Sequence, residues 1–353
     1  MDYLVSARCF TYNQAPYIEE TMDGFTMQNT SFPFVCIIVD DASTDGEPGV
    51  IRRYMNNNFD INDKSIVRSE DNDNYELSFA QHKTNKNCFF AVYYLKYNHY
   101  QINKDKFGYI SEFNDNVKYH ALCEGDDCWC HPQKLQMQFD FLESHEDYGM
   151  VHTDFDIING YRHHLKLNKD DDGNWFPRII TEGLTIGTLT VMYRKSIYDK
   201  IPKFFLYKGW PMQDKPKWYE LAHEAKIKHI PIVTARYRVL ENSASHSNDI
   251  NKLIAFKNAG VEIRLFYANY YGVKLDSDGY DASYYEGIIR YACQLNDKNV
   301  AKDYYTQAKS KNLLNFKAKL YYFATMVPII KPIIEYIVRL KNHRFLTVIA
   351  KYV

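Results

Sequence analysis

The chain has 353 residues, 46% of them hydrophobic, and a formal net charge of −1. Such a chain can bury a sizeable core, and we expect two domains or one domain with an appendage. The near-neutral charge excludes a global attraction for nucleic acid, which we do not expect as a partner, and a membrane partner would need a local basic patch. The seven cysteines are an odd number, lie mostly in apolar runs and follow no secretory signal, which favours a reduced, cytoplasmic protein over a disulfide framework.

Strand and helix signals alternate through the first half of the chain. Apolar, β-prone runs predict strands at 3–10, 34–39, 66–67, 119–123 and 149–153. Helices are predicted after Asn13 and Pro16, over about 49–57 behind Pro48, over about 88–100, and behind Pro132. The predicted fold class is therefore α/β, with a mostly parallel, doubly wound sheet flanked by helices.

The second half continues with one more strand and then becomes helical. A strand is predicted at 189–193, and a helix follows Asp214 with Trp218 and Leu221 on its buried side. Helical patterns cover 250–268 and 282–311, the second split near 295–297. These patterns predict a helical appendage behind the α/β domain.

Two acidic clusters directly follow predicted strands. Asp40 and Asp41 follow the second strand, and Glu124, Asp126 and Asp127 follow the fourth. Ligands of open α/β sheets bind beyond the carboxyl ends of the strands, so we expect one shared cleft. A helix cap and turn is the alternative for the first cluster. Three crowded acids at the end of a buried strand repel one another, which predicts a cation at the second.

Oxygen ligands alone select a hard ion such as Mg²⁺ or Mn²⁺, which commonly completes its coordination with substrate phosphates and water. The chain has no Gly-x-x-x-x-Gly-Lys-Ser/Thr loop and no Gly-x-Gly-x-x-Gly after its first strand. We therefore expect phosphate to be bound mainly through the metal. Zinc is the alternative at Cys128, Cys130 and His131, although no second Cys/His pair at finger spacing follows.

Several motifs, in order, resemble the family 2 glycosyltransferases of GT-A fold, bacterial enzymes that build capsule, O-antigen and other surface polysaccharides. The resemblance runs from about residue 4 to residue 246. The motifs are "VSARCFTYNQAPYIEETM", "FVCIIVDDASTDG", "EGDDCW", "HPQKLQMQFDFLE", "GLTIGTLTVMYRKSIY", "MQDKPKWYELA" and "YRVLENSASHS".

The resemblance implies a role for individual residues. Asp214 would be the catalytic base, and Asp126, Asp127 and His246 would hold Mn²⁺ or Mg²⁺. The donor nucleotide would be bound by Thr11, Tyr12, Asn13, Asp41, Ser43, Glu124 and Asp126, with Asp41 in contact with the nucleobase. Thr188, Trp210 and Gln213 would bind the acceptor.

The implied activity is inverting transfer of a sugar from a nucleotide-sugar, most commonly a UDP-sugar in this class, to a hydroxyl of a glycan or lipid-linked acceptor. A non-catalytic carbohydrate- or nucleotide-binding protein on the same scaffold is the leading alternative. A nucleotidyltransferase would need a glycine-rich, Arg-containing first loop, which "CFTYNQAPY" lacks. A receiver-type or phosphatase acid pocket leaves the motifs after Asp126 unexplained.

The predicted organisation is a GT-A catalytic domain over 1–248, a helical extension over 249–315 and an amphipathic C-terminal helix over 316–353. The nucleotide-binding half would be about 1–130 and the acceptor half about 131–248. Charges and prolines inside 320–340 disfavour a spanning helix, because a central charge costs about 2.5 to 3.5 kcal/mol. Flanking lysines and arginines favour a helix on the inner face of the plasma membrane, and a domain cap or a homodimer contact is the alternative.

Overall fold

The computed structural model describes residues 3–63, 65–158, 172–240 and 247–334. The chain forms two compact units, the first comprising 1–207 and 214–239, the second 208–213 and 240–353. The predicted domain boundaries after residues 130, 248 and 315 stay predictions.

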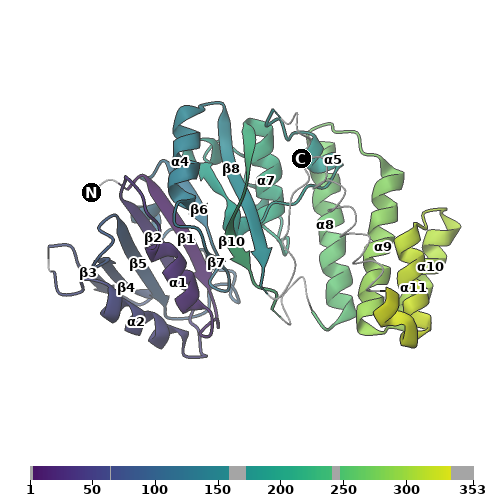
Figure 1. Ribbon diagram of the computed structural model, residues 1–353, viewed down its shortest axis with the longest axis horizontal. Coiled ribbons are helices and arrows are strands. Elements are labelled where there is room, and N and C mark those ends of the chain that lie inside the picture. Colours follow the sequence, from purple (N-terminus) through teal and green to yellow (C-terminus); the bar gives the residue numbers. More distant parts are fainter. Residues whose placement is uncertain (1–2, 64, 159–171, 241–246, 335–353) are drawn as a thin grey trace. The chain divides into compact units, whose positions relative to one another are not determined.

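Ten strands among the described residues form one mixed sheet in the first unit, in the order β3-β4-β5-β2-β1-β6-β9-β8-β10-β7 (Figure 1). The bounds are β1 Val5–Thr11, β2 Phe34–Asp40, β3 Arg68–Asp71, β4 Tyr75–Gln81, β5 Cys88–Leu95, β6 Tyr119–Leu122, β7 Cys128–Trp129, β8 Tyr148–Ile157, β9 Met192–Arg194 and β10 Lys226–Tyr237. The neighbours β5, β2, β1 and β6 run parallel, as do β8 and β10, and these pairings join more residues than the antiparallel ones. The predicted α/β fold class with a mostly parallel sheet is confirmed.

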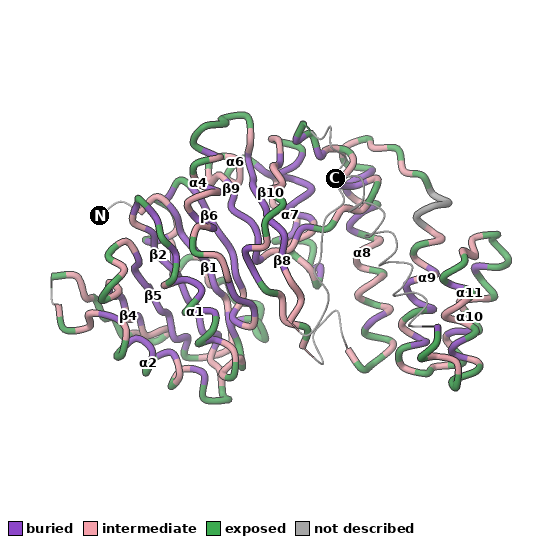
Figure 2. Tube along the Cα trace, viewed as in Figure 1, coloured by how far each residue is buried: buried purple, intermediate pink, exposed green. Residues whose placement is uncertain are grey.

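Helices cover both faces of the sheet. Those of the first unit are α1 Ile18–Thr26, α2 Glu47–Asn58, α3 Ser111–Asn114, α4 Lys134–Ser144, α5 Arg178–Thr181, α6 Lys195–Tyr198 and α7 Asp214–Glu224, with 3₁₀ turns η1 Thr188–Thr190 and η2 Phe204–Leu206. The apolar sides of α1, α2 and α4 form one core with alternate residues of β1, β2 and β6. Residues of the opposite face pack with α3 next to β2, and with α6 and α7 next to β9 and β10. Two-sided burial explains why every residue of β2 and β5 is buried (Figure 2).

The structure corrects the prediction of a helix over 88–100. This stretch instead forms β5, an internal strand that pairs in parallel with β2 and antiparallel with β4. Its sequence, "CFFAVYYL", is an uninterrupted apolar run rich in aromatic residues, which suits a strand buried on both faces better than a helix. The stretch 71–116 is therefore part of the central sheet.

Three smaller predictions are also wrong. The strand expected at 66–67 begins at Arg68, and the strand expected at 189–193 is the turn η1 followed by the short β9. Asn13 does not cap the first helix, because its φ of 54° is left-handed and α1 begins only at Ile18. Neighbouring loops determine these local conformations, and single-segment patterns do not contain that information.

The second unit is helical in its described residues. It contains α8 Ile250–Tyr270, α9 Ser277–Leu295, α10 Lys298–Ser310 and α11 Phe316–Met326, followed by the 3₁₀ turn η3 Pro328–Ile330. The predicted break between α9 and α10 is present, with Asn296 at a φ of 57° and Asp297 accepting a capping hydrogen bond from the Val300 amide.

The described part of the predicted C-terminal helix is interrupted. Its first segment, α11, is capped by Asn315 and ends before Pro328, where η3 begins. No helix in the described residues has the length and apolar character needed to span a bilayer. Residues 335–353 of the predicted helix lie outside the described part.

Candidate active site

The carboxyl ends of the parallel strands β1, β2 and β6 bring the two acidic clusters to one edge of the sheet. The strands end at Thr11, Asp40 and Leu122, and their register is continuous across the three. Beyond the edge, the Asp41 amide donates to the Thr11 carbonyl at 3.0 Å. The sequence-based expectation of a common location for the clusters therefore agrees with the strand order.

One buried carboxylate, Glu47, holds the first two loops together. It accepts hydrogen bonds from the Thr11 hydroxyl, the Gln14 amide (2.8 Å) and the Ser43 hydroxyl (2.9 Å). Asn13 adds a reciprocal pair, because its amide donates to Ser43 Oγ and its side-chain oxygen accepts from the Thr44 amide, both at 2.8 Å. Three predicted donor-binding residues, Thr11, Asn13 and Ser43, thus share one network.

Two further predicted donor-binding residues differ sharply in exposure. Tyr12 projects from the first loop with 39% of its surface exposed, whereas Asp41 is 2% exposed. The Asp41 carboxylate accepts from the backbone amides of His99 (2.7 Å) and Tyr100 (3.1 Å) and pairs with Lys106 Nζ at 2.9 Å. These three hydrogen-bond donors come from the segment between β5 and β6. This segment therefore orients the Asp41 carboxylate, which is predicted to contact the nucleobase.

The acidic loop packs tightly against the first loop. A side chain at Gly125 would collide with the Thr11 hydroxyl and the Gln14 side-chain oxygen. From α1, the Thr21 hydroxyl lies 2.9 Å from the Gly125 carbonyl and 2.6 Å from that of Asp127. Glycine is therefore required between Glu124 and Asp126 for this close approach.

The three acids of this loop carry raised pKa values. Burial, followed by the charges of Asp126 and Glu124, raises the pKa of Asp127 to about 9. Burial, followed by the charge of Asp126, raises the pKa of Glu124 to about 7, and burial raises the pKa of Asp126. A nearby cation or a bound proton stabilises buried carboxylates of this kind.

Arg238, at the end of β10, holds the acidic loop from the other side. Its amide donates to Asp127 Oδ1 at 2.8 Å, and its Nε donates to the Asp126 carbonyl at 2.9 Å. Its guanidinium also pairs with Glu20 at 2.5 Å and lies over the Tyr17 ring. One charge of Arg238 is thus shared between Glu20 and the acidic loop, which leaves the three loop acids only partly neutralised.

Asp214, the predicted base, is the first residue of α7 and is half-buried. It lies within electrostatic reach of Glu124, whose pKa its charge raises. Lys217, one turn further along α7, acts in the opposite direction on Glu124. The structure therefore brings Asp214 and the acidic loop to one region of the first unit.

The predicted acceptor residues fall in both units. Thr188 begins η1, which is joined to the acidic segment because Trp129 Nε1 donates to the Leu189 carbonyl at 2.9 Å. Trp210 and Gln213 belong to the second unit. There Trp210 is buried against Phe266 and Tyr267 and donates to Glu262 Oε1 at 2.9 Å. Gln213 is exposed.

The described residues supply only part of a metal site. Within the described residues no group of three or more His, Cys, Asp or Glu side chains is arranged to hold a metal ion, and His246 lies outside them. Asp126 and Asp127 offer oxygen atoms only, and burial is the largest cause of the raised pKa of each. This chemistry fits a hard divalent ion that takes its remaining ligands from a diphosphate and water.

Sequence reasoning missed Glu47, Arg238 and Lys217. Glu47 stands at the start of a helix, where an acid is ordinarily read as a response to the helix dipole. Arg238 and Lys217 lie inside motifs that the resemblance covers, yet no spacing rule connects them with residue 126. Their relation to the acidic loop depends on tertiary structure.

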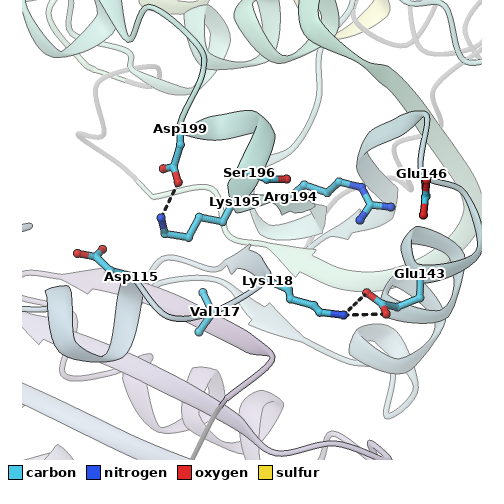
Figure 3. A pocket seen from close by; sticks show the side chains of 9 residues that line it. All are labelled: Asp115, Val117, Lys118, Glu143, Glu146, Arg194, Lys195, Ser196 and Asp199. Atoms are coloured by element: carbon cyan, nitrogen blue, oxygen red, sulfur yellow. Dashed lines mark hydrogen bonds and ion pairs between the residues drawn. The ribbon is translucent and has the colours of Figure 1, made fainter.

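A pocket of about 500 Å³ lies at the opposite edge of the sheet, where β6 begins (Figure 3). Four of its charged residues form ion pairs, Lys118 with Glu143 at 3.0 Å and Lys195 with Asp199 at 2.6 Å. It contains none of the predicted site residues. The candidate site at the carboxyl edge is therefore separate from this pocket.

Comparison with known proteins agrees with this location. Residues 10–77 match the model of the family described as "Glycosyl transferase family 2", a stretch that contains the first two loops of the site. The resemblance to family 2 glycosyltransferases is thus confirmed over this stretch.

Curated relatives include uncharacterized proteins of Mycobacterium tuberculosis (Rv1520) and Mycobacterium bovis (Mb1547). Each is 28% identical over 242 residues, which cover 67% of this chain and 59% of the relative. The chain thus matches less than two thirds of the length of these relatives.

Similar solved structures include S. aureus TarS 1-349 in complex with UDP-GlcNAc, with 14% identity, a TM-score of 0.45, and coverage of 91% of this chain and 90% of that one. A mannosyltransferase from Pyrobaculum calidifontis in complex with GDP-Man and Mn²⁺ has 15% identity and a TM-score of 0.46. The alignment covers 92% of this chain and 85% of that one.

Proposed function

We propose that the chain is an inverting glycosyltransferase that moves a sugar from a nucleotide-sugar, taken as a UDP-sugar, to a hydroxyl of a glycan or lipid-linked acceptor. The observation that carries this proposal is that four carboxylates, Glu124, Asp126, Asp127 and Asp214, lie near the sheet edge that also carries the first two loops. Those two loops fall within residues 10–77, which match the family 2 glycosyltransferase model. Surface polysaccharide synthesis is the proposed pathway.

In this proposal the donor lies across the carboxyl ends of β1, β2 and β6. Thr11, Tyr12, Asn13 and Ser43 line the nucleotide side, and Asp41 accepts from a ring N–H of the base. Glu124 faces the ribose or the diphosphate. The Glu47 network supports this assignment, since it fixes the first two loops before any ligand binds.

Asp126 and Asp127, with His246, would hold Mn²⁺ or Mg²⁺ against the diphosphate. When bound, the ion stabilises negative charge on the leaving phosphate. Arg238 keeps the loop in place, because its backbone amide occupies Asp127 Oδ1 and its Nε occupies the Asp126 carbonyl.

Asp214 would take the proton of the attacking acceptor hydroxyl from the face opposite the nucleotide. Such a base contributes about 10² to 10⁴ in rate. Attack from that face inverts the anomeric centre and needs no covalent sugar–enzyme intermediate. Thr188 would contact the acceptor within the first unit, and the assignments of Trp210 and Gln213 to the acceptor stay predictions.

The test compares Asp214→Asn with the unchanged chain in sugar transfer across a panel of nucleotide-sugars, with and without Mn²⁺. We expect turnover to fall by about 10² to 10⁴ while metal-dependent nucleotide binding stays within twofold. Asp199→Asn, at the amino edge, is the matched control. Unchanged turnover in Asp214→Asn removes the proposed base, and binding without transfer by the unchanged chain supports a non-catalytic binding protein.

For the second unit we propose attachment to an anionic membrane surface. Large apolar side chains of α11 and the following turn are exposed, among them Phe323 (57%), Ile329 (85%) and Ile333 (59%). Lys317 and Lys319 lie exposed on the same helix as Phe323. Apolar burial combined with attraction to anionic headgroups is the usual basis of interfacial binding, which would place the enzyme on the inner face of the plasma membrane.

A further inference from the structure

A polar cluster lies on the sheet face opposite α1, α2 and α4. Arg8 comes from β1, Tyr193 from β9, and Lys217 and Trp218 from α7. We call these four residues the Arg8 cluster. The Arg8 guanidinium carbon lies 5.7 Å from the centre of the Tyr193 ring, and the rings of Tyr193 and Trp218 are 6.4 Å apart. Four side chains from three elements thus meet within the first unit.

Hydrogen-bond donors predominate in this cluster. Arg8 Nε and Nη2, the Tyr193 hydroxyl and Trp218 Nε1 are all buried without a hydrogen-bond partner. The three residues are 4%, 0% and 2% exposed. Buried donors of this kind cost free energy unless an acceptor reaches them, so their convergence marks a place for a group that only accepts.

Charge at the cluster is only partly compensated. Among the described residues no carboxylate forms an ion pair with Arg8, and burial lowers the pKa of Arg8 to about 10, although Asp115 acts in the opposite direction. Burial, and then the charge of Arg8, lowers the pKa of Lys217 to about 8, against the charges of Asp214, Glu124 and Glu220. Because both pKa values remain lowered, an anion in contact with Arg8 would stabilise the charged forms of both side chains.

The groups that face Arg8 from neighbouring elements do not supply this anion. His120, on β6, shares a 2.7 Å hydrogen bond with the Ser6 hydroxyl, and burial holds its pKa well below the usual range, so the ring is neutral. Tyr198, on α6, places a neutral ring 5.9 Å from the guanidinium. Its own pKa is raised by burial, which keeps the phenol protonated.

We propose that the Arg8 cluster binds an oxyanion group, a carboxylate or a phosphate, carried by the acceptor substrate. Lys217 connects the cluster with the active site, because Asp214 and Glu124 both act on its charge. An anion held by Arg8 and Lys217 therefore lies on the side of the proposed base. That the anion belongs to the acceptor rests on the proposed function, whereas the binding of an oxyanion at Arg8 does not.

The alternative is a structural Arg8 held by its two tyrosine rings. Cation–π contacts satisfy the charge but leave Arg8 Nε, Arg8 Nη2 and Trp218 Nε1 without acceptors. The two explanations differ in their consequences. A structural arginine should be needed for folding, whereas a ligand-binding arginine that is unpaired without its ligand should be dispensable for it.

The experiment measures binding calorimetrically with the full chain, using three probes: inorganic phosphate, methyl β-glucuronide and the uncharged methyl β-glucoside. The variants are Arg8→Met, Tyr193→Phe, which removes one buried hydroxyl and keeps the ring, and the control Lys200→Met, which removes an exposed lysine shortly after α6. Mn²⁺-dependent UDP binding and the thermal midpoint are measured on every variant.

We expect saturable binding of phosphate, of the glucuronide or of both, none of the glucoside, and at least tenfold weaker anion binding in Arg8→Met and a smaller loss in Tyr193→Phe. The thermal midpoint of Arg8→Met should be unchanged or higher, and Lys200→Met should behave as the unchanged chain. Glucuronide binding identifies a carboxylate, and binding of phosphate alone identifies a phosphate group.

Absence of anion binding, or equal binding by Arg8→Met, overturns the proposal, as does a thermal midpoint lowered in Arg8→Met with anion binding retained. UDP binding separates this result from the proposed function. If the unchanged chain does not bind UDP but binds the anion, the proposed glycosyl transfer is contradicted and the anion site stands. If it binds UDP but no anion, the anion site is contradicted and the proposed function stands.

Discussion

The two edges of the sheet hold their charged side chains differently. At the amino edge, the pocket of about 500 Å³ contains two ion pairs, and Arg194 donates to two carbonyls and a tyrosine hydroxyl. At the carboxyl edge, burial and neighbouring carboxylates raise the pKa values of Asp127 and Glu124. Carboxylates perturbed in this way are common at functional sites, which supports the carboxyl edge as the candidate site.

The largest effect expected from this comparison concerns Asp127. In Asp127→Asn, the side-chain oxygen can still accept from the Arg238 amide, so folding should be nearly unchanged. Loss of the carboxylate should lower metal-dependent sugar transfer by about 10²-fold or more, because several kcal/mol of charge stabilisation is lost. Steady-state kinetics with Mn²⁺ checks this, with Asp199→Asn as the amino-edge counterpart. Equal losses in both variants would remove the contrast between the edges.

Gly125→Ala probes the contact between the first loop and the acidic loop. The new methyl group meets Thr11 and Gln14, so we expect a loss of about 1 to 3 kcal/mol in the free energy of unfolding. Gly49→Ala is the matched control, since a methyl group there meets no atom within 4 Å and should stabilise α2 by about 0.5 to 1 kcal/mol. Urea denaturation measures both. A neutral Gly125→Ala would show that the loops are not in close contact.

Lys134 extends the contrast to buried cations. Burial lowers its pKa to about 7, so between pH 7 and 10 the unfolded chain binds more protons than the folded chain does at this residue. Stability should therefore rise with pH in this window, by at most about 1.4 kcal/mol per pH unit. Lys134→Met should remove that part of the slope in denaturation curves collected from pH 7 to 10. Lys118→Met, which loses an exposed ion pair of the amino edge, should leave the slope unchanged and cost below about 1 kcal/mol.

The smallest expected effect concerns the second unit. Replacing Phe323 and Ile329 together by Ser should weaken binding to vesicles of anionic lipid by roughly 10-fold or more, through lost apolar burial. Cosedimentation at low and high salt measures it, and sugar transfer to a soluble acceptor should not change. Unaltered vesicle binding would reject the interfacial role of this region.

Much of the carboxyl edge could be predicted from sequence because its elements signal themselves locally. The apolar run 34–39 followed by Asp40, and the run 119–123 followed by Glu124, predict strand ends, and parallel strands place their ends together. Glu47, Arg238 and Lys217 could not be found this way. Each acts on a residue at least 30 positions away, through contacts that depend on the packed structure.

The incorrect helix at 88–100 shows a second limit. An apolar run does not by itself distinguish a fully buried strand from a buried helix, and the position of β5 between β4 and β2 resolves that ambiguity. Asp41 shows a third limit. Its carboxylate was predicted as a ligand of the base, but nothing in the sequence indicates that His99, Tyr100 and Lys106 already donate to it.

The location of β5 also determines how far the protein can be shortened. Residues 71–116 look like an accessory insertion in the linear chain, yet they supply an interior member of the sheet and the amides that orient Asp41. Excising them would leave β2 with an open hydrogen-bonding side and would remove the amides that hold the Asp41 carboxylate. A shortened version of this chain must therefore keep residues 71–116, because they form part of the interior of the sheet.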